Sequence, residues 1–179
     1  MVTPNHLTAI RLITGVVACA AFAMGDRNWA IWGGWLWLLS AFLNLADGEL
    51  ARVTGKTSPG GQVIDMFYDA TVTSLFFLGA GIGLRDEIFL DVELGQWPIW
   101  LGAAGVFAVE IFAEFIDRAE ADTGDKAYPV VWGFDFEDIL YLFAPVVWLN
   151  WHLYFVLGAA VGAPTFALFT WYKWRTMDR

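Results

Sequence analysis

Six long apolar stretches constrain the fold of this chain more than any other feature of the sequence. A helix needs about 20 mostly apolar residues to cross a hydrocarbon core of about 30 Å, because each residue adds about 1.5 Å. Stretches of this kind occupy residues 7–24, 29–50, 63–84, 97–116, 139–149 and 151–171, of which the fifth is the shortest and follows an acidic lead-in. The pattern predicts an all-α integral membrane protein, one domain over residues 1–179 with six transmembrane helices.

The composition agrees with a membrane protein and excludes several other classes. Hydrophobic residues make up 58% of the chain and charged residues only 16%, and 11 tryptophans fit the interfaces between lipid and water. The single cysteine, Cys19, excludes a disulfide framework within the chain. A net charge of −9 argues against nucleic acid as a partner, because binding to a phosphate backbone needs a basic surface.

The distribution of lysine and arginine predicts the orientation, since these residues concentrate on the cytoplasmic side of a membrane. With the N-terminus inside, only Arg27 and Arg85 face outward. The other basic residues lie inside: Arg11, Arg52, Lys56, Arg118, Lys126, Lys173, Arg175 and Arg179. Both termini are therefore expected in the cytoplasm, and the protein in the cytoplasmic membrane if its source is bacterial or archaeal.

Four polar residues near the ends of the second and third spans indicate a functional site. A carboxylate in a membrane span costs several kcal/mol unless it meets a cavity, a partner or a metal ion. Asn44 and Asp47 are three residues apart, and Asp65 and Asp69 are four apart, so each pair shares one face of its helix. We expect the four side chains to converge in a polar cavity open to the cytoplasm. The carboxylates repel one another, and their oxygen atoms are hard ligands; both properties favour one or two divalent cations, Mg²⁺ or Mn²⁺.

The turn between these spans carries residues suited to phosphate. Gly48, Gly60 and Gly61 allow a ligand to approach the backbone without a Cβ in the way. Arg52 and Lys56 are positioned to meet phosphate oxygens. A metal site next to phosphate contacts at a lipid surface predicts phosphoryl chemistry on a membrane substrate.

The pattern Asp47-Gly48-x2-Ala51-Arg52-x8-Gly61-x3-Asp65-x3-Asp69 resembles the signature of the CDP-alcohol phosphotransferases, class I. Residues 4–11, Pro-Asn-His-Leu-Thr-Ala-Ile-Arg, also resemble the family's entry into its first helix. The resemblance implies transfer of a phosphatidyl-type group from a CDP-alcohol lipid such as CDP-diacylglycerol to a small or lipid alcohol, with release of CMP, in phospholipid biosynthesis.

The resemblance also implies the roles of individual residues. Asp47, Asp65 and Asp69 are expected to bind the metal ion, and Asp69 is also expected to accept the proton of the acceptor hydroxyl. The residues expected to line the site of the cytidine diphosphate are Gly48, Ala51, Arg52 and Gly61, with Lys56 as a weaker candidate.

Asn44 departs from the family's pattern, which has an aspartate at this position. An amide offers one neutral oxygen, so the site loses a negative charge. Three interpretations stay open: a working enzyme with altered metal demand, an enzyme with an unusual substrate, or a catalytically impaired relative that binds CDP-lipids. A small cation-coupled transporter is a further alternative, although the outer halves of these spans carry few polar residues.

The second half of the chain suggests where the acceptor binds. Glu110, Glu114 and Asp117 recur at i, i+4 and i+7 near the cytoplasmic end of the fourth span, which makes one acidic stripe. Glu110 and Glu114, together with Arg118, are expected to form a wall for the acceptor alcohol. Because basic residues are few here, we expect an uncharged or cationic acceptor. Small residues at 79–83 and 158–162 predict close helix packing and permit a homodimer.

Overall fold

The structure is a computed structural model that describes residues 4–55, 59–123 and 139–177. These residues form six helices, namely α1 (Pro4–Ala23), α2 (Arg27–Thr54), α3 (Pro59–Gly83), α4 (Trp97–Thr123), α5 (Ile139–Trp148) and α6 (His152–Met177). Each of the six apolar stretches is therefore helical, as the sequence predicts. Between α3 and α4 lies a short antiparallel hairpin of β1 (Ile88–Phe89) and β2 (Val92–Glu93), which the prediction of an all-α fold did not include.

Within the described residues, five of the helices are long and apolar enough to cross a membrane. The exception is α5, which has ten described residues and thus a length of about 15 Å, half of a hydrocarbon core. The acidic lead-in that was predicted to extend it lies outside the described residues. The structure therefore supports an integral membrane protein with five candidate spans, and the predicted sixth span is not confirmed.

Local sequence fixes the ends of α2, the helix that carries Asp47. Asp26 caps its start, because the carboxylate accepts hydrogen bonds from the backbone N–H groups of Asn28 and Trp29 at 2.9 and 3.3 Å. Gly55 follows its last turn with φ of 65°, and its N–H donates to the carbonyls of Ala51 and Arg52. The turn into α3 thus begins just beyond Gly48, Ala51 and Arg52, three of the predicted nucleotide-binding residues.

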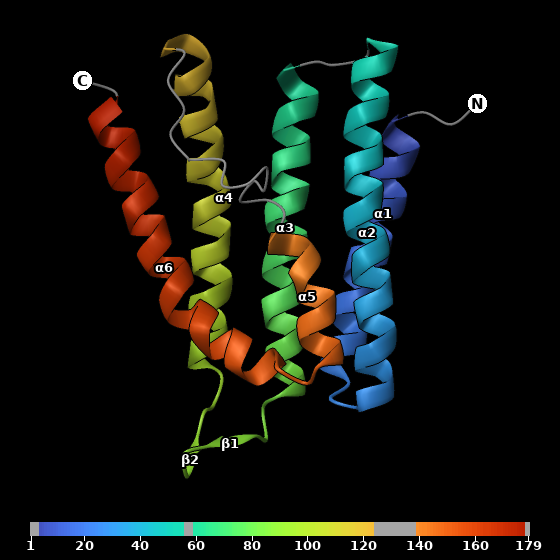
Figure 1. The fold of residues 1–179 in the computed structure, drawn as a ribbon, viewed down its shortest axis with the longest axis vertical. Coiled ribbons are helices and arrows are strands. Elements are labelled where there is room, and N and C mark those ends of the chain that lie inside the picture. Colours follow the sequence, from blue (N-terminus) through green and yellow to red (C-terminus); the bar gives the residue numbers. More distant parts are fainter. Residues whose placement is uncertain (1–3, 56–58, 124–138, 178–179) are drawn as a thin grey trace.

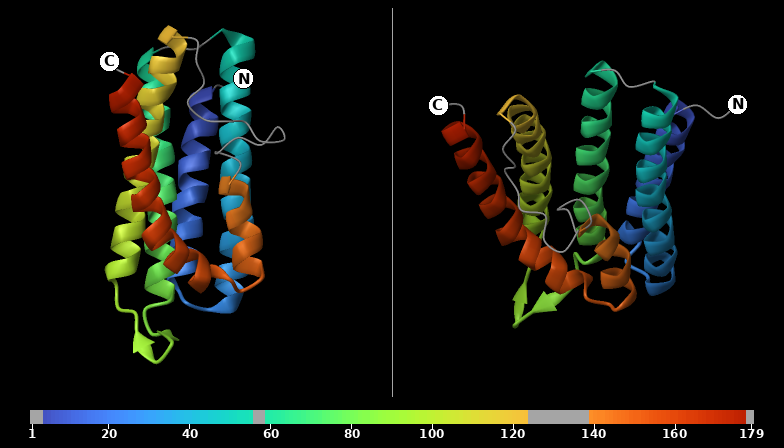
Figure 2. Two further views of the ribbon diagram at one scale, coloured as in Figure 1. Left: turned by 60° about the vertical axis from the view of Figure 1, so that its left-hand side comes forward. Right: turned by 45° about the horizontal axis from the view of Figure 1, so that its top comes forward.

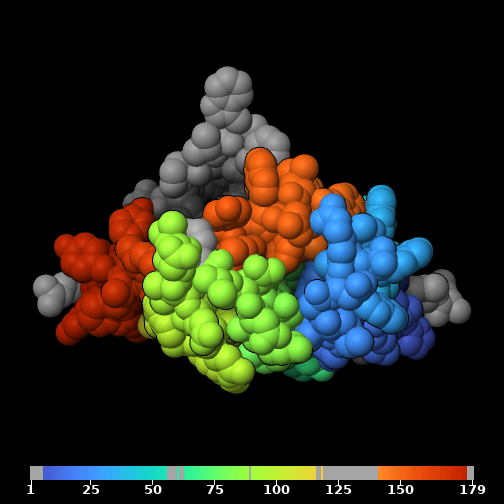
Figure 3. Space-filling view, turned by 90° about the horizontal axis from the view of Figure 1, so that it is seen from below, coloured from blue at the N-terminus to red at the C-terminus, as the bar shows by residue number. Residues whose placement is uncertain are grey.

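The helices form a bundle whose two ends differ (Figure 1). The chain termini and the connection between α2 and α3 lie at one end, and the β hairpin lies at the other (Figures 1 and 2). Seen from the hairpin end, the surface is formed by the α1–α2 turn, the hairpin segment and the region where α5 meets α6 (Figure 3). The side of a membrane that this end faces stays a prediction.

Aromatic side chains hold the centre of the bundle together. Phe76 of α3 stacks on Phe143 of α5 with 4.4 Å between ring centroids, and Trp37 of α2 lies 4.9 Å from Phe76. All three side chains are buried. Such contacts gain dispersion energy and aromatic pairing beyond the area that they bury. The short α5 is therefore anchored against α2 and α3.

Glycines allow the close approaches that the sequence predicted in the third span. A Cβ at Gly79 would lie 3.0 Å from the carbonyl carbon of Cys19, so α1 and α3 meet backbone to backbone. The packing prediction for residues 158–162 is only partly right. Ala160 is buried near Gly102 of α4, whereas a Cβ at Gly158 or Gly162 would meet no atom within 4 Å.

Candidate active site

The centre of the candidate site is Arg11, a residue that the sequence analysis did not assign to it. Arg11 lies on α1 and is only 3% exposed. Its Nη1 atom is 2.8 Å from Oδ1 of Asp65, and its Nη2 atom contacts Oδ1 of Asp69. One guanidinium therefore joins both carboxylates of α3, which lie on the same face of that helix as predicted.

Asp47 of α2 also contacts α1, the helix that carries Arg11. It is 4% exposed, and its Oδ2 atom accepts a hydrogen bond from the Thr8 hydroxyl of α1 at 2.9 Å. Arg11 also interacts electrostatically with Asp47 and Asp65, and with Glu110 of α4. Three carboxylates predicted from the motif are thus gathered around two side chains of α1.

The fold holds α1 in place to present Arg11. The Ser40 hydroxyl of α2 donates to the Arg11 carbonyl at 2.9 Å, and Ser40 is buried. One turn further along α1, a Cβ at Gly15 would lie 2.6 Å from Cγ1 of Val72 and 3.0 Å from the Ser40 hydroxyl. These close approaches let α1 pack against both α2 and α3. Arg11 of α1 thereby comes close to the aspartates of these two helices.

The sequence analysis predicted that the polar side chains of α2 and α3 converge in one cavity, and the structure differs from this prediction. Within the described residues, no three acidic, histidine or cysteine side chains are grouped so that they could hold a metal ion. The reason is that Arg11 lies against Asp65 and Asp69, while Asp47 is turned toward Thr8. The donor atoms are nevertheless hard carboxylate oxygens, which suit Mg²⁺ or Mn²⁺. Asn44 lies one turn before Asp47 on α2 and is partly buried.

Several of the predicted nucleotide-binding residues lie where the backbone or the side chain is accessible. A Cβ at Gly48 or Gly60 would meet nothing within 4 Å among the residues that the structure describes. Arg52 is 75% exposed and pairs with Glu49 at 3.5 Å. Gly61 lies in the first turn of α3, and Lys56 lies outside the described residues.

The predicted acceptor wall divides into two parts. Oε1 of Glu114 accepts a hydrogen bond from Nε of Arg118 at 2.8 Å, an i,i+4 ion pair with Arg118 about half exposed. Glu110 lines a cavity instead. Glu114 and Arg118 are not among the described residues that line it, and the predicted acceptor wall stays a prediction.

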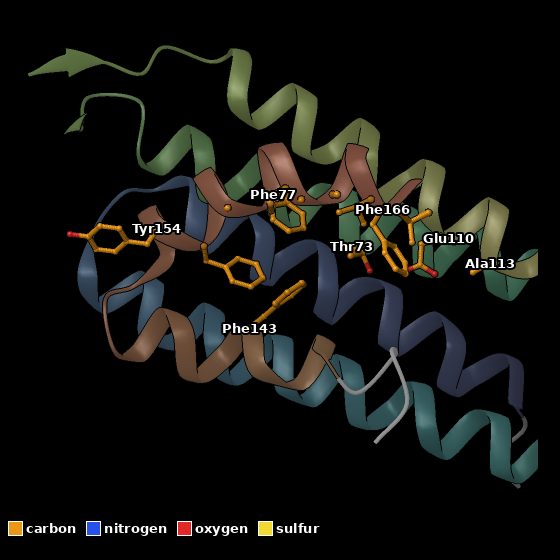
Figure 4. Close-up of a pocket in the computed structure, with 14 residues that line it drawn as sticks. Thr73, Phe77, Glu110, Ala113, Phe143, Tyr154 and Phe166 are labelled. Carbon is orange, nitrogen blue, oxygen red and sulfur yellow. The ribbon is translucent and has the colours of Figure 1, made fainter. Parts of the chain in front are cut away.

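That cavity lies between α3, α4, α5 and α6 and has a volume of about 520 Å³. Thr73, Phe166, Glu110 and Ala113 gather toward one end of it, and Phe77, Phe143 and Tyr154 lie toward the other (Figure 4). Its lining is mostly apolar. A second cavity, between α4 and α6, is also apolar. The sequence analysis predicted a polar cavity around the aspartates, and no aspartate is among the described residues that line these two cavities.

The helical bundle and the acidic site at one end define a helical integral membrane protein with a carboxylate cluster built from its first three helices. The sequence profile of the CDP-alcohol phosphatidyltransferase family matches residues 1–172, and the chain belongs to this family.

Two curated relatives resemble the chain over about half of its length. Archaetidylinositol phosphate synthase of Pyrococcus horikoshii is 33% identical over 100 residues, which cover 55% of this chain and 52% of that protein. CDP-diacylglycerol–glycerol-3-phosphate 3-phosphatidyltransferase of Cereibacter sphaeroides is 31% identical over 94 residues, which cover 51% of this chain and 42% of that protein. The matched segment thus spans about half the length of each relative.

Proposed function

We propose that this chain transfers a phosphatidyl-type group from a CDP-alcohol lipid, such as CDP-diacylglycerol, to an acceptor alcohol in phospholipid biosynthesis. The observation that carries the proposal is that Asp65 and Asp69 contact Arg11 of α1, while Asp47 accepts a hydrogen bond from Thr8 on the same helix. These contacts lie toward the end of the bundle where α2 ends and α3 begins. Family membership supports the same chemistry and favours a transferase over a cation-coupled transporter.

The nucleotide is proposed to lie along the α2–α3 turn. The open space beside the backbone at Gly48 and Gly60 lets a ligand approach these positions closely. Arg52 is exposed, and its guanidinium is free to exchange Glu49 for the oxygens of a diphosphate, because a surface ion pair contributes little free energy. We place this end of the bundle, with both termini, on the cytoplasmic side.

The carboxylates provide the ligands for a divalent cation. Asp47, Asp65 and Asp69 would hold Mg²⁺ or Mn²⁺, which when bound neutralises charge on the diphosphate. With Arg11 beside them, the three carboxylates leave a formal charge of −2. One divalent cation balances that charge, and Asn44 adds none. The residue pattern therefore favours a site that functions with a single ion.

The proposed reaction is a displacement at phosphorus. The acceptor hydroxyl oxygen forms a bond to the phosphorus that carries the donor's alcohol, and the bond from that phosphorus to the bridging oxygen breaks. CMP leaves with the electron pair, and the hydroxyl proton passes to the Asp69 carboxylate. Arg11 orients Asp69 for this role, since its guanidinium contacts Oδ1 of that carboxylate.

The test is release of CMP from CDP-diacylglycerol by the purified protein in lipid, with Mg²⁺ or Mn²⁺ or with a chelator. The acceptor panel comprises glycerol phosphate, inositol, inositol phosphate, serine, simple polyols and acylglycerols. We expect metal-dependent release that falls by about 10²-fold to 10⁴-fold in Asp69→Asn, the usual contribution of a positioned base.

Asp86→Asn is the matched control, because Asp86 lies 88% exposed in the segment that leads to the β hairpin, at the opposite end of the bundle. Its turnover should equal that of the wild type. Undiminished turnover in Asp69→Asn would refute the assignment of the base. Binding of the nucleotide without turnover in the wild type would instead indicate the catalytically impaired relative that Asn44 suggests.

A further inference from the structure

The cavity between α3, α4, α5 and α6 has a chemical character that distinguishes it from the carboxylate site. Aromatic and aliphatic side chains make up most of its wall. Glu110 is the one charged residue among the described residues that line it, and these include no lysine or arginine. A phosphate group in this space would lie beside a carboxylate without a cation from the wall, which is unfavourable in an apolar environment.

The polar end of the cavity is one helical turn of α3 from the proposed catalytic carboxylate, which is not itself among the described lining residues. Thr73 lines the cavity and lies four residues after Asp69, on the same face of α3 and one turn deeper in the bundle. Phe77 continues that face by a further turn. Figure 4 shows Thr73 near Glu110 at one end and the rings of Phe77 and Phe143 farther along. A ligand with a hydroxyl at the Thr73 end would place its remaining atoms among aromatic rings.

Two glycines of α6 keep this space open. Gly158 and Gly162 line the cavity, and a Cβ at either position would meet no atom within 4 Å in the described part of the chain. Packing against another helix therefore does not explain the absence of a side chain there. A larger residue at either position would instead take up volume in the cavity.

We propose that this cavity binds the acceptor, and that the acceptor is an uncharged alcohol whose hydroxyl is attached to an apolar chain or ring, as in an acylglycerol. The proposal rests on the proposed function, because it assigns the second substrate of that reaction. The lipid tails around the protein are as apolar as the cavity, so occupancy gains little from the hydrophobic effect. The cavity instead positions the hydroxyl beside Asp69, which lowers the entropy cost of the reaction.

The first experiment maps the occupant directly. A monoacylglycerol with a diazirine in its acyl chain is photolysed with the protein in lipid nanodiscs, and the labelled residues are identified by mass spectrometry. We expect labels on the cavity residues of α3 and α6. Gly162→Leu should reduce this labelling about tenfold or more, because a leucine and an alkyl chain cannot fill the same close-packed space. Val161→Phe is the matched control, since Val161 is 68% exposed on α6 and lies outside the cavity lining.

A parallel arm uses CDP-diacylglycerol with the same diazirine. Label from this donor in the cavity, at the expense of label from the monoacylglycerol, would assign the space to the donor chain and overturn the proposal. Gly158→Leu repeats the test at the second open position if Gly162→Leu does not give a folded protein by circular dichroism and gel filtration.

The second experiment measures CMP release with the two kinds of acceptor. Acylglycerols should support turnover, and Gly162→Leu should raise their KM while leaving the KM for CDP-diacylglycerol unchanged. Faster turnover with glycerol phosphate or inositol phosphate, unaffected by Gly162→Leu, would refute the proposal and leave the transferase function intact. Cavity labelling without CMP release from any acceptor would overturn the proposed function, while the cavity would stand as a site for apolar alcohols.

Discussion

Replacing Arg11 with methionine removes the buried cation that contacts Asp65 and Asp69, while it retains the length and apolar character of the side chain's stem. Deleting one partner of a fully buried ion pair costs about 3–5 kcal/mol, because the other charge stays buried without compensation. Here Asp65 and Asp69 are 40% and 24% exposed, so water reaches both carboxylates. We therefore expect a loss of about 2–3 kcal/mol in the free energy of unfolding.

The assay is reversible unfolding by sodium dodecyl sulfate in mixed micelles, followed by far-UV circular dichroism, with a chelator present. Arg118→Met is the matched control, since Arg118 also forms an ion pair at 2.8 Å but is about half exposed. Its loss should cost less than about 1 kcal/mol, as is usual for pairs on the surface. The difference between the two variants measures the effect of burial around Arg11.

Two further results separate an electrostatic role of Arg11 from simple packing. Asp69→Asn should restore part of the stability lost in Arg11→Met, with a coupling of about 0.5–3 kcal/mol between the two positions. Mg²⁺ should stabilise Arg11→Met more than the wild type, because removing the guanidinium makes the formal charge of the carboxylate cluster more negative by one. Equal losses in Arg11→Met and Arg118→Met, with no coupling to Asp69, would refute the reasoning.

Two other variants test the packing and the charge of the site. Gly79→Ala should lower the free energy of unfolding by about 1–3 kcal/mol, because the new Cβ would press on the Cys19 backbone. Gly158→Ala should leave the free energy of unfolding unchanged or raise it by up to about 1 kcal/mol, because the space at its Cβ is open. The same detergent titration measures both, and equal effects would contradict the packing seen here. Asn44→Asp adds a carboxylate near Asp47 and should tighten Mn²⁺ binding about tenfold or more, measured by electron paramagnetic resonance. Unchanged affinity would place residue 44 outside the ion's coordination sphere.

The local part of the site could be predicted from the sequence because helical periodicity determines it. Asp65 and Asp69 share a face of α3, and the spacing of four residues is sufficient to establish this. The helix positions follow equally from the lengths of the apolar stretches. Both predictions depend on interactions within one helix, which the order of residues specifies directly.

Arg11 was missed because its contacts are distant in the sequence. It meets Asp65, 54 residues away, only after α1 packs against α3. One signal was present, since an arginine inside an apolar stretch needs a partner to compensate for its burial. In the sequence analysis Arg11 supports only the orientation of the chain, and the partner that its burial requires was not predicted. The partner of Asp47, Thr8, gives no comparable signal because threonine is common in membrane helices.

The sequence by itself determined the class of protein, the positions of six helices, the topology with both termini at one end, and the motif that identifies the family. These properties follow from hydropathy, periodicity and fixed spacing along the chain. The tertiary structure decided that Arg11 and Thr8 engage the acidic residues, and that Gly158 and Gly162 line an apolar cavity. Contacts and cavities between helices depend on how closely their backbones approach and how each helix is rotated, and no local pattern in the sequence specifies either quantity.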